Sequence, residues 1–345
     1  MPVESIDLDG DIIIECGDDS FQICSKVMSA ASPVLSAMFS PHSKEGTSIV
    51  NGSEGPVVIP VGGDDPEALL TFCSIVHFRI DEIPENLSST FLENFTTLID
   101  KYMCKKAVAS QVRLWLMRDL GTLNVTQLCP LLLLAYVMDL PERFAAISKE
   151  LLFAHAGSYA DLSLLVDHPL IHSNVVGRQS TSLYVLDGAS LSTIAVDFER
   201  KRRELHRIAR KAITSVLNSF TAFKADESKY VTLYTWKLQA CGLLPSTDVF
   251  EAKSFKQVYW DALKLPKCHP APCHVSGCVC MSIKALKQDA ELLRLLSNCR
   301  KAKVGMCLDC LRSNGSSFPK CRSTHPSFGD DKAIFTEESV IMIYA

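Results

Sequence analysis

The first 61 residues of the chain contain three strand-like runs, and a long region of helical periodicity follows them. β-branched or aromatic runs occur at residues 11–16, 21–24 and 57–61. From residue 66 to about residue 155, apolar side chains recur at spacings of three and four, as on one face of a helix. Both kinds of apolar face need partners. The pattern therefore predicts an α+β fold, in which a three-stranded sheet is covered by helices.

Turn and breaker residues set the expected limits of these segments. Residues 17–20 have the glycine and aspartate composition of a hairpin turn, and Ser32-Pro33 predicts a break between two short helices. Glycine and serine between residues 46 and 55 predict a loop before the third strand. The helices that follow are expected at residues 66–78, 88–103, 105–118, 125–138 and 141–155.

Composition places the chain among globular proteins with room for about two domains. Of its 345 residues, 47% are apolar and 21% are charged, which is close to the globular average and excludes wholesale disorder. The formal net charge of −4 argues against a chain-wide electrostatic footprint for nucleic acid. We therefore expect no nucleic-acid partner.

The ends of the chain and its most apolar run predict neither export nor membrane insertion. The N-terminus is acidic and lacks the basic and apolar regions of a secretory signal, so an intracellular location, cytoplasmic or nuclear, is expected. The run at residues 128–140 contains Pro130 and Asp139 and is short of the roughly 20 residues that span a bilayer. It predicts a buried helix.

Eight of the fourteen cysteines fall between Cys268 and Cys321, and this cluster is the candidate site of the chain. In a reducing compartment such a cluster favours metal ligation over disulfides. Cys307 and Cys310 form a C-x-x-C pair, the spacing of one half of a tetrahedral zinc site. Cys268 with Cys273, or Cys273 with Cys278, is a candidate for the other half. A second interpretation, reduced thiols lining a helix joint, stays open. The ligand candidates for one structural zinc ion are Cys268, Cys273, Cys278, Cys280, Cys307 and Cys310.

The six remaining cysteines lie among apolar neighbours, where small buried side chains are expected. They are Cys16, Cys24, Cys73, Cys104, Cys129 and Cys241.

A charged helix is expected from Asp197, with an apolar stripe and seven basic residues between Arg200 and Lys211. This segment, residues 199–211, together with the C-terminal cysteines, is the basis of an alternative function: a zinc-dependent nucleic-acid-binding or transcriptional regulator. Glu199 and Glu204 are interspersed with the basic residues, which favours a solvated structural helix instead.

Catalytic signatures are absent from the sequence. There is no H-E-x-x-H, no G-x-S-x-G, no Walker loop and no G-x-G-x-x-G after a strand. Gly62 and Gly63 precede a helix, but the next residues are Asp64 and Asp65, whose charges would repel a phosphate. We therefore expect a protein that is not an enzyme, with no catalytic residues and no bound organic cofactor.

Four strings in the first third of the chain resemble the BTB/POZ domain. Residues 9–14 read DGDIII, like the acidic entry into that family's first strand. Residues 25–39 read SKVMSAASPVLSAMF, like its pair of short helices, and residues 65–69 (DPEAL) and 98–102 (LIDKY) resemble later helical segments. The sequence of residues 39–46 is most similar to those of BTB proteins of the filamentous-fungal type.

The resemblance implies a protein-interaction module that pairs with itself or with another BTB domain. Many members act as adaptors that hold a client protein for a cullin-type ubiquitin ligase. Relatives that bind cullin usually carry a hydrophobic-x-Glu element, whereas this chain has Ser43-Lys44-Glu45. The apolar surface of the helix pair is the expected dimer interface, although the same pattern would suit internal core. Its candidate residues are Val27, Met28, Ala31 and Leu35.

The expected organisation follows from these segments. It consists of a BTB/POZ domain at residues 5–120, a helical extension at 121–160, a loop and helical region at 161–262, a cysteine-rich segment with one helix at 263–326, and a tail at 327–345.

Overall fold

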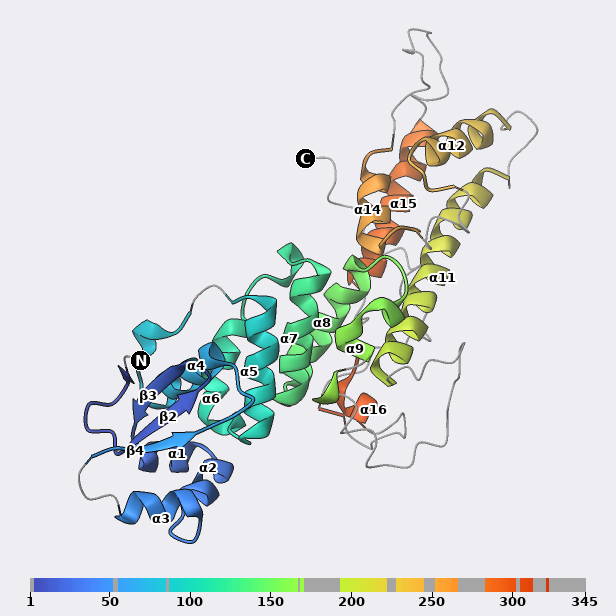
Figure 1. The fold of residues 1–345 in the computed structure, drawn as a ribbon. Helices are drawn as coiled ribbons and strands as arrows, with labels where there is room; N and C mark the ends of the chain where they lie inside the picture. The colour runs from blue at the N-terminus through green and yellow to red at the C-terminus, as the bar shows by residue number, and fades with distance from the viewer. Residues whose placement is uncertain are drawn as a thin grey trace. The chain divides into compact units, whose positions relative to one another are not determined.

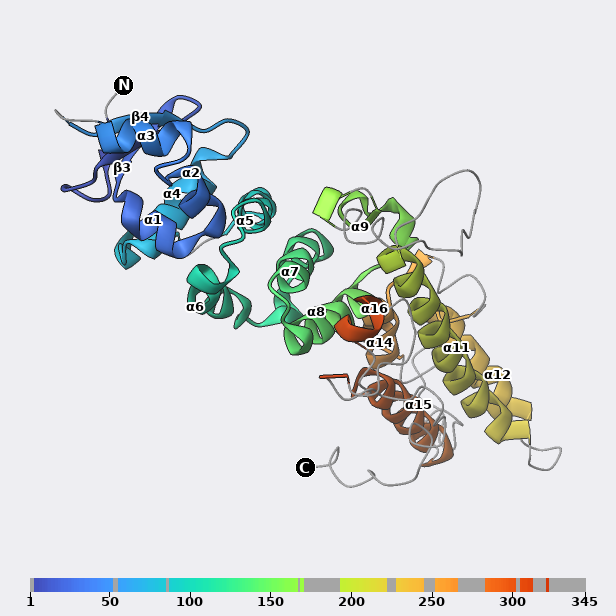
Figure 2. The same ribbon diagram turned by 90° about the horizontal axis from the view of Figure 1, so that it is seen from below.

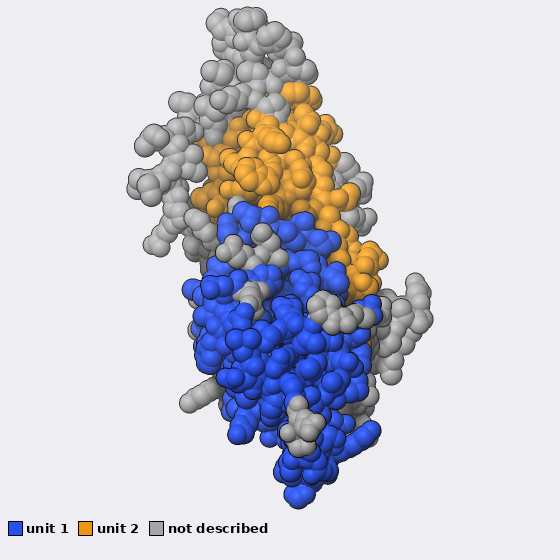
Figure 3. Space-filling model, turned by 60° about the vertical axis from the view of Figure 1, so that its left-hand side comes forward, with its two compact units in different colours: residues 1–144 blue, residues 145–345 orange. Residues whose placement is uncertain are grey.

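The computed structural model describes residues 3–51, 55–84, 87–166, 168–170, 193–221, 228–244, 252–265, 283–301, 305–312 and 321–322. The chain divides into two units, residues 1–144 and residues 145–345 (Figure 3). The fold is α+β and mostly helical, and every strand among the described residues belongs to unit 1. No helix of the described ranges is long and apolar enough to cross a membrane.

Unit 1 contains a mixed sheet whose strand order is β1-β3-β2-β4 (Figure 1). Strands β2 (Ile12–Cys16) and β3 (Asp19–Ile23) form the predicted antiparallel hairpin, and β4 (Val57–Pro60) pairs with β2 in parallel. The sheet has four strands because β1 (Glu4–Ser5) adds to the outer edge of β3. The prediction of three strands was therefore wrong. A strand of two residues has no alternation that a sequence could reveal.

The helix pair between β3 and β4 breaks where the sequence predicted. Helix α1 covers Ser25–Ala31 and α2 covers Pro33–Met38. The hydroxyl of Ser32 caps α2 by accepting a 3.1 Å hydrogen bond from the backbone N–H of Leu35. The same hydroxyl donates to the backbone carbonyl of Tyr102 at 2.6 Å, so one buried serine joins the pair to the end of a later helix.

The expected loop at residues 46–55 is wrong over its first half, where helix α3 (Lys44–Asn51) forms. Ser43 starts this helix, because its hydroxyl accepts a 2.9 Å hydrogen bond from the N–H of Gly46. A β-carbon on Gly46 would lie 1.8 Å from the carbonyl oxygen of Ser40, so glycine is needed here for close packing. Residues 52–54 lie outside the described residues.

Four further helices complete unit 1, and their apolar faces are buried as predicted. The faces of α4 and α5 include Leu69, Phe72, Phe95, Leu98 and Ile99, each at most 2% exposed. The elements are α4 (Pro66–Val76), the 3₁₀ turn η1 (Ile80–Glu82), α5 (Ser89–Lys101), α6 (Lys105–Leu116), the 3₁₀ turn η2 (Leu120–Thr122) and α7 (Val125–Val137).

Helix α7 is the predicted buried helix, with a run of ten buried residues from Leu128 to Val137. Pro130 lies inside it and has no N–H for the carbonyl of Thr126, four residues earlier. That carbonyl accepts a 3.0 Å hydrogen bond from the hydroxyl of Ser89 in α5 instead. The proline is tolerated because a neighbouring helix satisfies the carbonyl group that it leaves unpaired.

Unit 2 is built around α11 (Thr193–Thr221), which packs against α12 (Ser228–Ala240) and α15 (Ile283–Lys301) (Figure 2). The predicted stripe of α11 is confirmed at Leu205, Ile208, Ala212, Ile213 and Val216, which are buried in this core. The other elements are the end of α8 (Pro141–Ala154), the 3₁₀ turn η3 (Tyr159–Asp161), α9 (Ser163–Val166), α14 (Phe255–Leu263) and α16 (Leu308–Arg312).

Candidate metal centre

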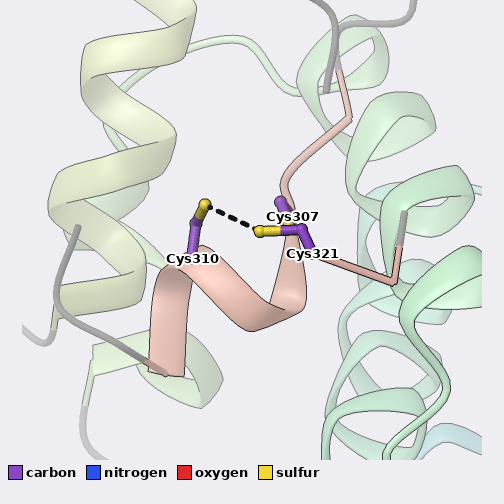
Figure 4. Close-up of side chains that lie close together, drawn as sticks. All are labelled: Cys307, Cys310 and Cys321. Atoms are coloured by element: carbon purple, nitrogen blue, oxygen red, sulfur yellow. Dashed lines mark hydrogen bonds between the residues drawn. The ribbon is translucent and has the colours of Figure 1, made fainter. Parts of the chain in front are cut away.

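Three cysteines of unit 2 lie close enough together to hold one metal ion. The sulfur atoms of Cys307, Cys310 and Cys321 all lie within 4.8 Å of one another, and each residue is partly buried. The Sγ atoms of Cys310 and Cys321 are 3.6 Å apart and point toward each other (Figure 4). This is the one group of the kind within the described part of the chain.

The C-x-x-C spacing brings the first two thiols together through a single turn of helix. Cys307 immediately precedes α16, and its carbonyl accepts a 3.0 Å hydrogen bond from the N–H of Leu311. Cys310 follows three residues later, which places it on the same side of the turn as Cys307. Leu308 and Leu311 are buried and anchor the opposite side of the turn. The local sequence therefore presents two thiols toward one point.

Cys321 reaches this point because the residue after it pairs with the helix. The backbone N–H of Arg322 donates to Asp309 Oδ2 at 2.7 Å, and the Arg322 guanidinium lies 2.6 Å from Asp309 Oδ1. These hydrogen bonds lower the pKa of the Asp309 carboxyl. Asp309 and Arg322 are the neighbours of Cys310 and Cys321, so their pairing fixes the two cysteine-bearing segments side by side.

The segment before α16 is fixed to α8. The backbone N–H of Met306 donates a 2.7 Å hydrogen bond to the hydroxyl of Ser148, and both residues are buried. Ser148 in turn donates to the carbonyl of Ala145 at 3.0 Å. Gly305 lies directly against the same part of α8. The cysteine cluster therefore begins at a point where the chain is held rigidly to a helix.

The electrostatics of the cluster suit a metal–thiolate centre. Burial, followed by the neighbouring thiols of Cys321 and Cys307, raises the pKa of Cys310 to about 12, so without a metal ion the thiol is neutral. Lys201 on α11 lies near enough for Cys307 and Cys310 to raise its pKa, although burial and then Arg200 lower it more strongly. A divalent cation would relieve the crowding of thiolates, and Lys201 would balance part of their charge.

The predicted ligands are brought together in part. Cys307 and Cys310 lie at the cluster, whereas Cys268, Cys273, Cys278 and Cys280 lie outside the described residues. Cys321, which the prediction counted in the cluster but not among the ligands, is the third member. Its signal in the sequence was weak: it is the nearest cysteine on the C-terminal side of the C-x-x-C pair, and short loops cost little entropy to close.

Four of the six scattered cysteines are buried as predicted, namely Cys16, Cys73, Cys104 and Cys129, whereas the prediction was wrong for the other two. Cys299, nearer in sequence to the pair than Cys321, is 1% exposed in the core of unit 2. Burial raises the pKa of Cys104, Cys129 and Cys299 to about 12. Cys24 and Cys241 are only partly buried.

The predicted dimer residues fall into two groups. Met28 and Leu35 are 0% and 1% exposed in the core of unit 1, so they offer no surface to a partner. Val27 and Ala31 are partly exposed. Ala31 lines a shallow hollow beside Met103, which is 64% exposed. The hollow is formed by Ala30, Ala31, Pro33, Asp100, Met103, Lys105, Lys106 and Ala107.

The basic helix α11 carries ion pairs along its own surface. Arg200 pairs with Asp197 at 2.7 Å, Arg202 with Glu199, and Arg207 with Glu204 at 2.7 Å. The acidic residues interspersed with the basic ones therefore offset part of the positive charge of α11.

No protein-family model matches the chain, and a search of curated proteins finds no match to it.

Proposed function

We propose that this chain is a non-catalytic protein-interaction protein with a BTB/POZ-like module in unit 1. The observation that carries the proposal is the order of its elements. A β2–β3 hairpin leads into the broken helix pair α1–α2, β4 then returns parallel to β2, and α4, α5 and α6 follow. The resemblance concerns residues 9–118, and it implies strands, a pair of short helices, a third strand and further helices in this order. By the same resemblance the module pairs with itself or with another BTB domain, and holds a client protein.

The hollow between α1 and the start of α6 is the surface that we assign to self-association. Its lining combines small and apolar side chains with charged groups of both signs, namely Asp100, Lys105 and Lys106. In a twofold pair this surface meets its own copy, so Asp100 of one copy and the lysines of the second copy belong to the same interface. The sign of the charges therefore favours a second copy of this chain as the occupant.

Sedimentation of the full-length chain tests this proposal. The wild type should sediment as a dimer, and Ala31→Asp or Met103→Asp should give a monomer, because each places a charge in the apolar part of this lining. Val50→Asp is the matched control, since Val50 is 69% exposed on α3 and away from the hollow. A wild-type monomer at about 100 μM would contradict self-association of useful strength, since dimers of this kind need micromolar affinity or better.

For unit 2 we propose a structural zinc ion held by Cys307, Cys310 and Cys321. Thiolate sulfur is a preferred zinc donor, and a tetrahedral site with Zn–S bonds of about 2.3 Å has sulfurs about 3.8 Å apart. The separation of 3.6 Å between Cys310 and Cys321 is close to that value. A closed site takes a fourth ligand, for which the cysteines at 268, 273, 278 and 280 remain the candidates. The ion would stabilise α16 against α8 and α11.

Metal analysis tests the zinc proposal. Protein purified without chelator should contain about one zinc ion per chain, and Cys310→Ser should abolish it. Cys241→Ser is the control, because Cys241 is also partly buried in unit 2 but does not belong to the cluster. Loss of zinc should expose the bond after Arg312 to trypsin while unit 1 stays resistant. Retention of a full zinc equivalent by Cys310→Ser would exclude these ligands.

The alternative function, a zinc-dependent nucleic-acid-binding regulator, is less well supported. The acidic partners on α11 reduce the charge available for phosphate, and the net charge of the chain is −4. Two results together would favour the nucleic-acid-binding regulator over the interaction module. They are a Kd for DNA or RNA below about 1 μM at about 150 mM salt, and a steep fall of that affinity as the salt concentration rises.

A further inference from the structure

Cys310 and Cys321 are placed for a second reaction besides metal binding. We propose that a hydroperoxide converts this pair into a disulfide, and that the reaction releases the metal ion bound by the same sulfurs. The release of metal depends on the zinc site proposed above, whereas formation of the disulfide does not. The cluster would then respond to oxidants through one defined cross-link.

The geometry of the two thiols supports the cross-link. Their sulfur atoms are 3.6 Å apart, and a disulfide bond is about 2.05 Å long, so the two sulfurs need to approach by about 1.5 Å to form the bond. Both cysteines are partly exposed, which allows a small peroxide to reach them. Figure 4 shows the two side chains directed at each other from separate segments of the chain.

The backbone on both sides of the pair is held in place without any metal. Asp309 and Arg322, the neighbours of the two cysteines, share a backbone-to-carboxylate hydrogen bond of 2.7 Å. Two further bonds join the Arg322 guanidinium to Asp309 Oδ1 at 2.6 and 3.0 Å. The thiols therefore stay close in the metal-free protein, so a second thiol is available to trap an oxidised sulfur before it reacts further.

The reaction balances with a hydroperoxide as the oxidant. The first sulfur attacks the O–O bond of hydrogen peroxide, becomes a sulfenic acid and releases one water in net terms. The second thiol then attacks that sulfur, the S–O bond breaks, and a second water leaves. Overall, two thiols and one hydrogen peroxide give one disulfide and two waters. From the metal-bound state, two thiolates and two protons take the place of the two thiols, and the metal ion leaves.

The test uses the full-length protein and peptide mapping. The protein is treated with hydrogen peroxide, free thiols are blocked with N-ethylmaleimide, and the denatured chain is cut on the N-terminal side of aspartate. Cleavage at Asp309 and Asp330 gives a peptide of residues 309–329, which contains Cys310 and Cys321 and separates them from Cys307. The expected product is this peptide with an internal disulfide and no maleimide. A metallochromic dye follows zinc release in parallel.

Two variants separate the cross-link from the zinc site. Cys307→Ser should lose zinc before any oxidant is added and still form the disulfide within residues 309–329. Cys321→Ser should form no disulfide in that peptide, and Cys241→Ser should behave as the wild type in both measurements. A protein that contains no zinc but forms the cross-link would contradict the metal proposal alone.

Three results would overturn the proposed cross-link. The first is a peptide that carries two maleimides after oxidation, the second is sulfinic or sulfonic acid at its cysteines, and the third is a bond between Cys310 and Cys307. Each of them would show that the pair at 3.6 Å is not the preferred partner pair.

Discussion

The carbonyl oxygen of Ala145 lies 2.0 Å from the point where a β-carbon would stand on Gly305. That carbonyl belongs to the backbone of α8, so it cannot move aside as the end of a flexible side chain could. The chain can therefore pass α8 and enter the cysteine cluster only with glycine at this position.

Gly305→Ala should detach the segment that leads into α16. We expect unit 2 to lose about 1–3 kcal/mol of stability, because this is the typical cost of overpacking a tight contact. Tryptic cleavage after Arg312 should also become faster. Urea denaturation and timed proteolysis measure the two effects. Gly62→Ala is the control, because a β-carbon there meets nothing within 4 Å. Equal behaviour of the two variants would contradict the close contact at Gly305.

Removal of one member of a buried ion pair should destabilise unit 2 strongly. Lys237 Nζ lies 2.5 Å from Asp289 Oδ2, and the lysine side chain is only 2% exposed. Among the described residues, Asp289 Oδ1 is buried and has no hydrogen-bond partner. Lys237→Met would leave the carboxylate uncompensated, at a cost of roughly 3 kcal/mol.

The double variant Lys237→Met with Asp289→Leu should recover most of this loss, because no charge is then left buried. Urea denaturation of both variants measures the difference. A double variant less stable than Lys237→Met would show that the pair stabilises the core by more than its own desolvation costs.

The stability of unit 2 should depend on pH through His206. Burial, followed by Arg202 and Arg210, lowers the pKa of His206 from its ordinary 6.5 to about 4, and Glu199 opposes the shift. The folded state therefore favours neutral imidazole. Its contribution is complete above pH 6.5 and is lost as the pH falls toward 4, by up to about 3 kcal/mol. His206→Leu should flatten this part of the profile in urea denaturation at successive pH values. If stability still falls as steeply between pH 6.5 and pH 4 in His206→Leu, the assignment of this pH dependence to His206 is contradicted.

Ser32→Ala should weaken unit 1 at the helix break. The substitution removes both the cap of α2 and the hydrogen bond to the carbonyl of Tyr102, and that residue is 4% exposed. We expect a loss of about 2 kcal/mol, the sum of a typical cap and a buried bond. Thermal unfolding of Ser32→Ala measures this loss of stability. The control is Ser36→Ala, because Ser36 is an exposed serine in α2.

The burial of residues that repeat at helical spacing was predictable from the sequence. The periodicity of α5 identified Phe95 and Ile99 as core, and both are 0% exposed. Helix α3 was missed because its glycine and serine composition favours loops, and a contact with the carbonyl of Ser40 overrides that preference. Propensity is a weak guide where tertiary packing decides.

The candidate metal site also has a part that local sequence spacing predicts and a part that depends on tertiary contacts. The C-x-x-C spacing identified Cys307 and Cys310, since one helical turn is enough to bring them together. Cys321 joins them through the pairing of Asp309 with Arg322, which no local pattern encodes. In unit 1, the apolar face of α1 and α2 was visible in the sequence, but only the fold shows that Met28 and Leu35 are covered by the chain itself.

The two edges of the sheet bear on how this chain can assemble. One edge strand, β1, has two residues, and the other, β4, has four and ends at Pro60, which has no N–H to donate. Such short edges give an incoming strand little to pair with, so they work against the strand-by-strand growth that leads to fibres. If copies of the chain associate, contacts between helices are therefore favoured over pairing of strands at these edges.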